Sequence, residues 1–177
     1  MNRVSVKNMC AIAVAAAAVA VLSQIAIPTP LGVVMTLQTF VVPLVGCLLG
    51  WKRGATALIV YLLLGAVGAP VFAEFSGGFH CFVGPTGGFL LGFPLMAMFA
   101  GFAAHQGGLK RAMWLLAGVV VDYTLGVVVF MLVTGSGLWA AIEACVLLFL
   151  PLEAVKQVCV WVLAPRLSRV LERAGAI

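Results

Sequence analysis

Six long apolar runs alternate along the chain with short polar or glycine-rich connections. The runs cover residues 9–27, 34–50, 55–69, 89–104, 112–133 and 138–163. A run of about 20 apolar residues crosses the hydrocarbon core of a bilayer as one helix, and these runs lie near that length. The pattern therefore predicts an all-α integral membrane protein with six transmembrane helices, forming a single transmembrane domain over residues 1–177.

The first apolar run is rich in alanine and closes on Pro28-Thr29-Pro30. Its small residues recur four apart, at Ala11 and Ala15 and at Ala13 and Ala17, a spacing that allows another helix to approach closely within lipid. That helix belongs either to the same bundle or to a partner protein, and both alternatives stay open at this point. The run lacks a small-x-small cleavage site, so we expect a span and not a cleaved signal peptide.

Two interruptions break the regular pattern. Pro43 lies inside the second run, where a kink is expected. Residues 70–88 form the longest connection, rich in glycine, too irregular to face lipid and too apolar for an ordinary solvated loop. We expect this segment to fold back over a cavity, and we call it the capping loop.

Composition indicates that the protein lies in a lipid bilayer, and the distribution of charge indicates its orientation across that bilayer. The sequence is 64% hydrophobic and 8% charged, which no soluble fold of this size hides in one core. In a six-span chain all basic residues except Lys156 fall on one side, the side that the positive-inside rule assigns to the cytoplasm. They are Arg3, Lys7, Lys52, Arg53, Lys110, Arg111, Arg166, Arg169 and Arg173. Both termini are therefore predicted to be cytoplasmic.

Several functions are disfavoured by the pattern. The basic residues form isolated pairs without a stripe or interleaved aromatic residues, so no nucleic-acid partner is expected. The five cysteines lack CxxC spacing, and His80 and His105 lack metal-ligand spacing, so we expect no disulfide framework and no metal. The chain contains no GxxxxGK[ST] and no GxSxG motif, so we expect neither ATP hydrolysis nor another enzymatic activity, and no cofactor.

Three polar residues of the last run form a candidate site. A charged side chain at bilayer depth costs roughly 2.5–3.5 kcal/mol on insertion scales, so Glu153 and Lys156 need partners or water. Three residues apart they share a helix face, and Gln157, four residues after Glu153, joins them. The alternative is a buried ion pair that only fixes helix packing.

Asp122 is a further charged residue within an apolar run. It has no charged neighbour on its own predicted helix, and the simplest expectation is a hydrogen bond to Tyr123, Thr124 or a facing backbone group. Glu74 and Glu143 lie near the predicted outer surface, where solvation of a carboxylate is cheap.

Three motifs stand in a fixed order along the chain: Thr36-Leu37-Gln38-Thr39, the segment from Tyr61 to Phe72, and Gly84-Pro85-Thr86-Gly87-Gly88-Phe89-Leu90-Leu91-Gly92-Phe93. Together they resemble the signature of the BioY family, the biotin-binding S components of energy-coupling factor (ECF) transporters. The resemblance extends over the whole chain, and the order of three motifs is far more specific than any one alone. It implies six helices, a substrate cavity closed on the outer side by the capping loop, and a place in a prokaryotic cell membrane.

The resemblance also implies partners. These are biotin as the ligand, a transmembrane coupling protein and cytoplasmic ATPases of the ABC type. The coupling protein is expected to use the small-residue stripe of the first run. The stripe consists of Ala11, Ala13, Ala15 and Ala17.

The family carries an Asp-x-x-Lys element on its last helix, which maps onto Glu153-Ala154-Val155-Lys156, so the acid here is one methylene longer. Pro151-Leu152-Glu153 replaces the family's Pro-Gly-Asp, and Phe89 stands where the family has tyrosine. The candidate substrate-binding residues are Glu153, Lys156, Gly84, Thr86, Gly87, Gly88, Phe89 and Gln38. We hypothesise that Glu153 accepts from the ureido group and that Lys156 pairs with the carboxylate, because burying an anionic ligand needs a positive group.

Three other functions remain as alternatives, and the first of them keeps the same topology. An S component for another vitamin would bind a different ligand. A structural membrane subunit would carry no ligand, and an intramembrane enzyme would turn its substrate over.

Overall fold

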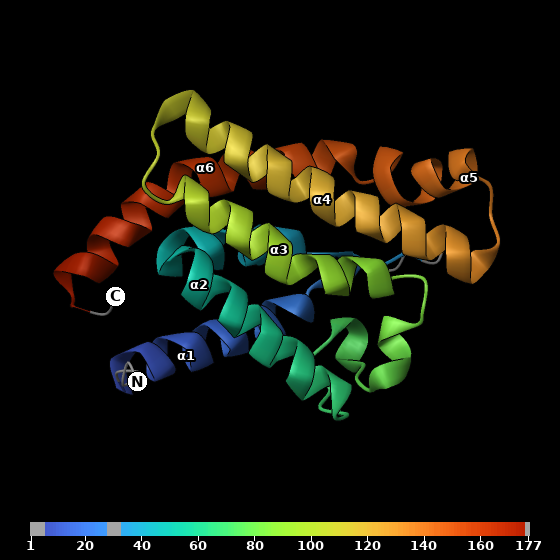
Figure 1. Ribbon diagram of the computed structural model, residues 1–177, viewed down its shortest axis with the longest axis horizontal. Helices are drawn as coiled ribbons and strands as arrows, with labels where there is room; N and C mark the ends of the chain where they lie inside the picture. Colours follow the sequence, from blue (N-terminus) through green and yellow to red (C-terminus); the bar gives the residue numbers. More distant parts are fainter. Residues whose placement is uncertain (1–5, 28–32, 176–177) are drawn as a thin grey trace.

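The computed structural model describes residues 6–27 and 33–175, which are almost wholly helical (Figure 1). The long helices are α1 (Val6–Ser23), α2 (Gln38–Ala66), α3 (Gly87–Ala103), α4 (Gly108–Thr134) and α6 (Leu150–Arg173). Shorter elements connect them: strands β1 (Ala26–Ile27) and β2 (Met35–Thr36), and helices η1 (Ala73–Phe75), η2 (Phe79–Phe82), α5 (Leu138–Ile142) and η3 (Glu143–Leu147). Pro28, Pro30 and Arg3, which entered the sequence-based predictions, lie outside the described residues.

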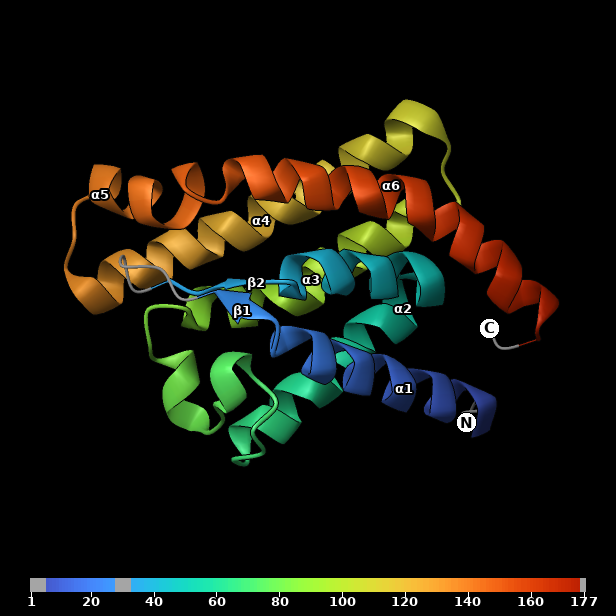
Figure 2. The same ribbon diagram turned by 180° about the vertical axis from the view of Figure 1, so that it is seen from behind.

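Helix α3 occupies the middle of the bundle. It packs between α2 and α4, while α1 and α6 each pack against α2 (Figures 1 and 2). The start of α1, the end of α6 and the α3–α4 connection lie at one end of the bundle. The capping loop and the α4–α5 turn lie at the opposite end (Figure 1).

Helix α2 is a hairpin of two halves. Gly50 has φ 78° and ψ 170°, angles that do not belong to a helix. A Cβ atom on Gly54 would lie 2.9 Å from the Cα of Gly46, whereas residues eight apart in a straight helix are separated by about 12 Å. The chain therefore reverses at Gly50, and residues 38–49 and 51–66 correspond to the second and third predicted runs. The sequence predicts a kink at Pro43 and a break between the second and third runs, and the residue with non-helical angles is Gly50, at that break.

Length and apolar composition identify α1, α2 and α4 as candidate spans among the described residues. The pair formed by α5 with η3 and by α6 is a fourth candidate, bent by 45°. This tally is lower than the six predicted runs because α2 counts once although it doubles back, and because α3 is short. The coarse prediction of a helical membrane bundle agrees with these helices.

Three element boundaries differ from the sequence-based prediction. Helix α1 ends at Ser23, before the expected 27, because residues 26–27 pair with residues 35–36 in a small antiparallel sheet. That pairing also removes residues 34–37 from the second helix. At the other end of the chain, α6 continues through Pro165 to Arg173, since a proline removes one helical hydrogen bond without necessarily ending the helix.

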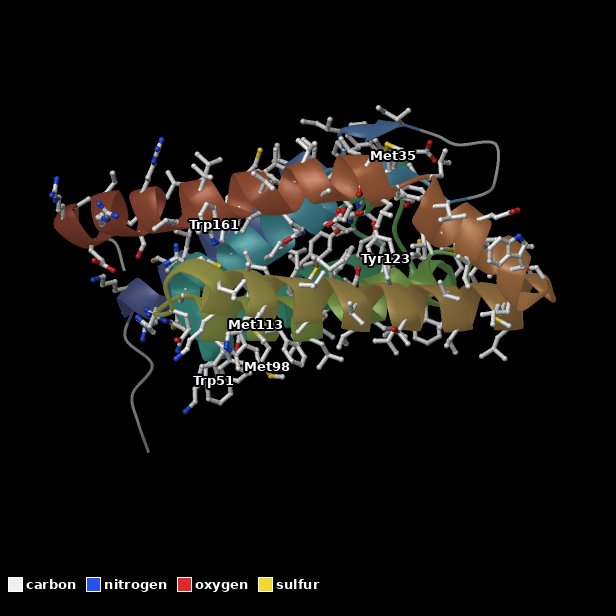
Figure 3. The ribbon with its side chains drawn as sticks, turned by 90° about the horizontal axis from the view of Figure 1, so that it is seen from above. Met35, Trp51, Met98, Met113, Tyr123 and Trp161 are labelled. Carbon is white, nitrogen blue, oxygen red and sulfur yellow. The ribbon has the colours of Figure 1, made fainter. Side chains whose placement is uncertain are left out.

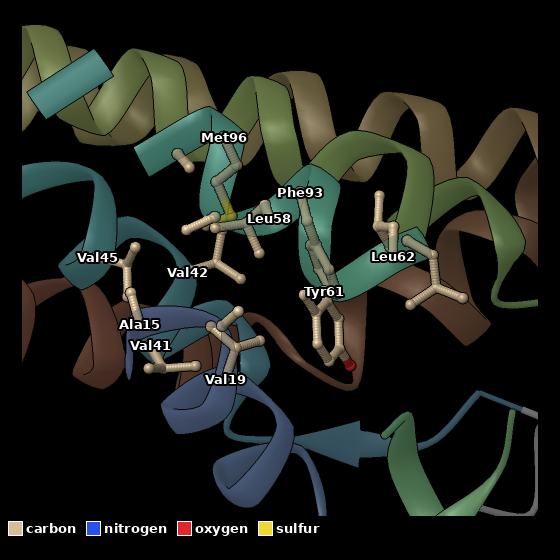
Figure 4. Packing of buried hydrophobic residues seen from close by; sticks show 14 of the residues in the cluster. Ala15, Val19, Val41, Val42, Val45, Leu58, Tyr61, Leu62, Phe93 and Met96 are labelled. Carbon is tan, nitrogen blue, oxygen red and sulfur yellow. The ribbon is translucent and has the colours of Figure 1, made fainter. Parts of the chain in front are cut away.

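The main hydrophobic core lies between α1, α2 and α3. Val19, Val42, Leu58, Tyr61 and Met96 are fully buried there (Figure 4). The packing fixes the two halves of α2 between α1 and α3. It thereby positions the N-terminal end of α2, where the polar residues of the second run lie.

Candidate functional site

A cavity of about 290 Å³ lies at the end of the bundle that carries the capping loop. Its walls come from the segment before α2, the start of α2, the capping loop, α3, α4, the η3–α6 junction and α6. Aromatic rings form much of the apolar wall, and they are Phe72, Phe89, Phe93 and Phe149. One group of polar lining residues comes from the segment before α2 and from α2, α4 and α6, and it is called the polar side: Thr36, Gln38, Thr39, Tyr123 and Lys156. The capping loop adds Glu74, Ser76, His80 and Thr86.

Lys156 provides the cationic group of this polar side. Its Nζ donates to the carbonyl oxygen of Thr36 at 2.6 Å and to Oγ1 of Thr39 at 2.9 Å. The carboxylate of Glu153 lies 3.6 Å away, one helical turn earlier on α6. Both side chains are almost fully buried, so α6 holds a compact ion pair against the start of α2. Lys156 lines the cavity, whereas Glu153 is not part of its lining.

Glu153 is surrounded by donors. Thr39 Oγ1 donates to it at 2.6 Å and Tyr123 Oη at 3.3 Å, both to Oε2, and Gln157 Nε2 donates to Oε1 at 2.7 Å. Figure 3 shows Tyr123 between α4 and α6. Together with Lys156, four groups from three helices meet at one carboxylate. This arrangement uses most of its acceptor capacity and orients the cavity-facing groups Thr39, Tyr123 and Lys156.

Gln38 is held from two sides. Its Nε2 donates to the hydroxyl of Tyr61 at 2.8 Å, and its Oε1 accepts from Thr36 Oγ1 at 2.9 Å. Tyr61 is fully buried and packs edge-on against the ring of Phe72, with ring centroids 5.4 Å apart. The amide of Gln38 therefore lies at the cavity wall in a fixed orientation.

Phe89 and the paired glycines occupy different environments. Phe89 lines the cavity, stacks edge-on against Tyr123 at 5.5 Å and lies over Gly126. Gly84 and Thr86 also line the cavity. Gly87 and Gly88 do not. A Cβ on Gly87 would clash with the carbonyl of Phe82, and one on Gly88 with the carbonyl of Leu125 on α4.

Asp122 does not make the hydrogen bond that we expected. It is fully buried, and neither carboxyl oxygen has a hydrogen-bond partner within the described residues. Tyr123 donates to Glu153, and Thr124 donates to Val120 in its own helix. Asp122 instead packs against Gly92 of α3, the position where a Cβ would collide with its Oδ1.

The alanines of α1 separate into two faces. Ala15 is buried in the main core, and Ala11 packs partly buried against it. Ala13 and Ala17 are exposed on the outer face of the bundle. The stripe of small residues is therefore divided between internal packing and a free helix face.

Several cavity residues were missing from the sequence-based set. Thr39 belongs to the first of the three motifs, but the sequence-based prediction does not include it among the binding residues, and it indicates Tyr123 only as a partner for Asp122. Cys145 and Phe149 reach the cavity because η3 is a π-helical turn followed by a bend. No periodic signal in the sequence marks such a turn, whereas the position of Thr39, three residues after Thr36, was a usable signal.

This site has the chemistry of a binding pocket. It combines aromatic walls, one buried cation and a few oriented amide and hydroxyl groups, the usual composition of a pocket for a small organic molecule. A mostly apolar ligand with one acidic end and hydrogen-bonding groups would be complementary to this cavity.

Comparisons with known proteins point in one direction. The family model described as the BioY family matches residues 1–173. A Rhodobacter capsulatus protein named biotin transporter BioY is 35% identical over 181 residues, covering 92% of this chain and 94% of that protein. A Thermotoga maritima protein of the same name is 47% identical over 108 residues, covering 58% and 63%.

The fold also has a solved counterpart. A crystal structure of the S-component for biotin from an ECF-type ABC transporter matches with a TM-score of 0.85 and 25% sequence identity. The match covers 96% of this chain and 94% of that one.

Proposed function

This chain belongs to the BioY family, and from that premise we propose that it is the biotin-binding S component of an ECF-type ABC transporter. Its relatives are named as biotin transporters and its structural neighbour as the S-component for biotin. The chain functions in transport and not as an enzyme. The observation that carries the proposal is the buried ammonium of Lys156 at the wall of an otherwise largely apolar cavity.

The chemistry of biotin suits this cavity. Its fused bicycle and aliphatic chain present apolar surface, its ureido group offers two N–H donors and one carbonyl acceptor, and its chain ends in a carboxylate. The aromatic residues of the cavity wall pack against the bicycle, and Lys156 pairs with the carboxylate, since a buried anion needs a positive partner. The ureido group lies at the opposite end of biotin from the carboxylate, so polar lining residues of the capping loop, Ser76 and Thr86, satisfy it, whereas Thr39 bonds to Lys156 itself.

Glu153 has a different proposed role from the one suggested by the sequence. We first expected it to accept directly from the ureido group. Because four donors already surround its two oxygens and it does not line the cavity, Glu153 instead orients Lys156, Thr39 and Tyr123. Gly84, Thr86 and Phe89 contact the ligand from the capping loop and the start of α3. Gly87 and Gly88 act by allowing that part of the chain to pack closely.

The topology is also part of the proposal. The chain crosses the prokaryotic cytoplasmic membrane six times as one domain, with the two halves of α2 and α3 as the second, third and fourth spans. Both termini are cytoplasmic, because the described basic residues other than Lys156 lie on helix ends and connections at the end of the bundle opposite the capping loop. The outer face of α1, with Ala13 and Ala17, contacts the coupling protein, and separate ABC-type subunits hydrolyse ATP.

The first experiment identifies the ligand and then tests Lys156 and Glu153. Native mass spectrometry of the purified protein is expected to detect bound biotin. Lys156→Ala is expected to weaken biotin binding about 100-fold, because a charge-assisted contact is lost. Glu153→Ala is expected to weaken it about tenfold by releasing the groups it orients. Titration of each purified variant with labelled biotin measures these changes.

Lys110→Ala is the matched control, since Lys110 is exposed at the start of α4. It is expected to bind like the wild type. If both site variants keep the affinity within about twofold of the wild type, the assigned roles are wrong. A different vitamin in the mass spectrum would keep the S-component class and replace the ligand.

A further inference from the structure

The end of α1 is attached to the capping loop through Ser23. Its side chain is fully buried, and its Oγ lies 2.7 Å from the carbonyl oxygen of Val71. The same hydroxyl lies 2.7 Å from the carbonyl of Ala20 in its own helix. Ser23 therefore places the last turn of α1 directly against the beginning of the capping loop.

Gln24 makes the second attachment and uses both ends of its amide. Its Nε2 donates to the carbonyl oxygen of Phe72 at 3.1 Å. Its Oε1 accepts from the backbone N–H of Phe75 at 2.8 Å. One side chain thus holds two backbone groups of the capping loop, one just before η1 and one at the last residue of η1.

The turn between those two groups is strained. Glu74 has φ 58° and Phe75 has φ 53°, a left-handed conformation that side-chain-bearing residues adopt rarely and that persists only when the surroundings hold it. Phe72 N also donates to the carbonyl of Ser76 at 3.0 Å, which closes the turn. Gln24 ties this closed turn to the end of α1, and two residues after the turn Gly78 N donates to the carbonyl of Gly65 in α2 at 2.7 Å.

The held turn forms part of the cavity wall. Phe72, Ala73 and Glu74 line the cavity, and the ring of Phe72 covers Gly65 of α2 and packs edge-on against Tyr61. Releasing the turn from α1 would free Ala73 and Glu74 to move away from the cavity, while the ring of Phe72 stays packed on α2.

The same end of α1 reaches the polar side of the cavity. Leu37 N donates to the carbonyl of Ile25 at 3.3 Å, and Ala26 pairs with Thr36 in the β1–β2 sheet (Figure 2). The carbonyl of Thr36 is an acceptor for Lys156. The short segment after α1 is therefore joined both to the capping loop and to the backbone that holds the cation.

From these contacts we propose that Ser23 and Gln24 form a latch that holds the capping loop over the cavity and sets how fast the ligand exchanges. They are positioning residues, since neither lines the cavity. The identity of the ligand as biotin rests on the proposed function, whereas the latch itself rests on contacts within this chain. A partner that shifts α1 would act on the capping loop through these two side chains.

The test measures loop opening directly and ligand exchange separately. Hydrogen–deuterium exchange of the ligand-free protein is expected to show amides of residues 71–78 exchanging about tenfold faster in Gln24→Ala, because two anchoring hydrogen bonds are lost. Dissociation of labelled biotin is expected to accelerate about tenfold while association is not slowed. A damaged cavity would instead slow association or reduce the number of binding sites.

Two further variants and a control sharpen the test. Gln24→Glu keeps an acceptor for Phe75 N–H and loses the donor to Phe72, so its exchange is expected to lie between the wild type and Gln24→Ala. Ser23→Ala removes the other attachment and is expected to accelerate the same amides. Gln106→Ala, in the α3–α4 connection at the opposite end of the bundle, is expected to behave like the wild type.

The latch is refuted if residues 71–78 exchange at the wild-type rate in both Gln24→Ala and Ser23→Ala, or if Gln106→Ala accelerates them equally. If the variants open the loop but the wild-type protein does not bind biotin, the proposed function fails and the latch stands. If biotin binds but its dissociation stays at the wild-type rate although the loop opens faster, control of ligand exchange by the latch is refuted.

Discussion

A polar side chain between membrane helices must find its partners within the protein, because lipid provides none. Thr39 meets this requirement by linking two charges: it donates to Glu153 and accepts from Lys156. One hydroxyl thereby bridges the carboxylate of Glu153 and the ammonium group of Lys156, which lie 3.6 Å apart. The cation stays available at the cavity wall without being left unpaired when no ligand is bound.

Asp122 is a buried polar side chain without such partners among the described residues, and it leads to a prediction. Its carboxyl group is buried against Gly92 without a hydrogen-bond partner in the described part of the chain. Asp122→Asn keeps the shape and removes the charge, so we expect an unfolding free energy equal to the wild type or up to about 1 kcal/mol higher. Thermal unfolding in detergent measures the change.

Glu143→Gln makes the same exchange of acid for amide at an exposed position and is expected to leave stability unchanged. A loss of more than about 1 kcal/mol in Asp122→Asn alone would show that the carboxyl group has a partner in the membrane that the helices do not supply.

Sequence spacing predicts contacts within one helix far better than contacts between helices. Glu153, Lys156 and Gln157 were grouped correctly because residues three and four apart share a helix face. Their contacts with Thr39 and Tyr123 cross from α6 to α2 and α4, and no local pattern encodes those crossings. For the same reason the sequence does not show that Gly84 lines the cavity whereas Gly88 packs against α4. The two glycines look alike within one motif.

At the scale of elements, glycine determines how closely the helices approach. Gly46 lies against the backbone of Ala97, and Gly88 lies against the backbone of Leu125. These contacts place α3 directly on α2 and α4. In a membrane such close packing replaces the hydrophobic drive that lipid does not supply.

Gly88→Ala tests this packing. A Cβ atom at this position would collide with the carbonyl of Leu125, and because a backbone group cannot rotate away, α3 and α4 must separate. We expect a loss of about 2 kcal/mol in unfolding free energy, read as a lower melting temperature in detergent.

Gly107→Ala is the matched substitution, because Gly107 has open space around it and φ of −110°. It is expected to change stability by less than about 0.5 kcal/mol. Equal melting temperatures for the two variants would contradict the packing role of Gly88.

Element boundaries were predictable where apolar runs end at charges or glycines, as at Gly50 and Gly107. They were not predictable where tertiary contacts end a helix. Residues 25–27 are apolar and would suit a helix, yet residues 26–27 pair with β2, and Ser23 and Gln24 before them bond to the capping loop. The π-helical turn at η3 is likewise a product of packing against α4.

At the scale of the whole molecule, the two ends of the helical bundle differ in the residues that they carry. The cavity and capping loop occupy one end, and the helix ends and connections that carry the described basic residues other than Lys156 lie at the other (Figure 1). Such an arrangement suits a protein that receives its ligand on one side of a membrane and meets its energy-supplying partners on the other.

Thiol labelling tests this orientation. In a background with the five native cysteines replaced by alanine, Ser136→Cys in the α4–α5 turn is expected to react with a membrane-impermeant thiol reagent in intact cells. His105→Cys in the α3–α4 connection is expected to react only after lysis, because the positive-inside rule places it in the cytoplasm. Labelling of His105→Cys in intact cells would overturn the six-span topology.

The reversal at Gly50 also has a consequence for how the chain is made. At about 1.5 Å per residue, residues 38–49 rise only about 18 Å as a helix, well short of the ~30 Å hydrocarbon core. We therefore expect that half to enter the bilayer together with residues 51–66, as a pair. In the proposed topology Lys52 and Arg53 then remain on the cytoplasmic side, where the chain is synthesised.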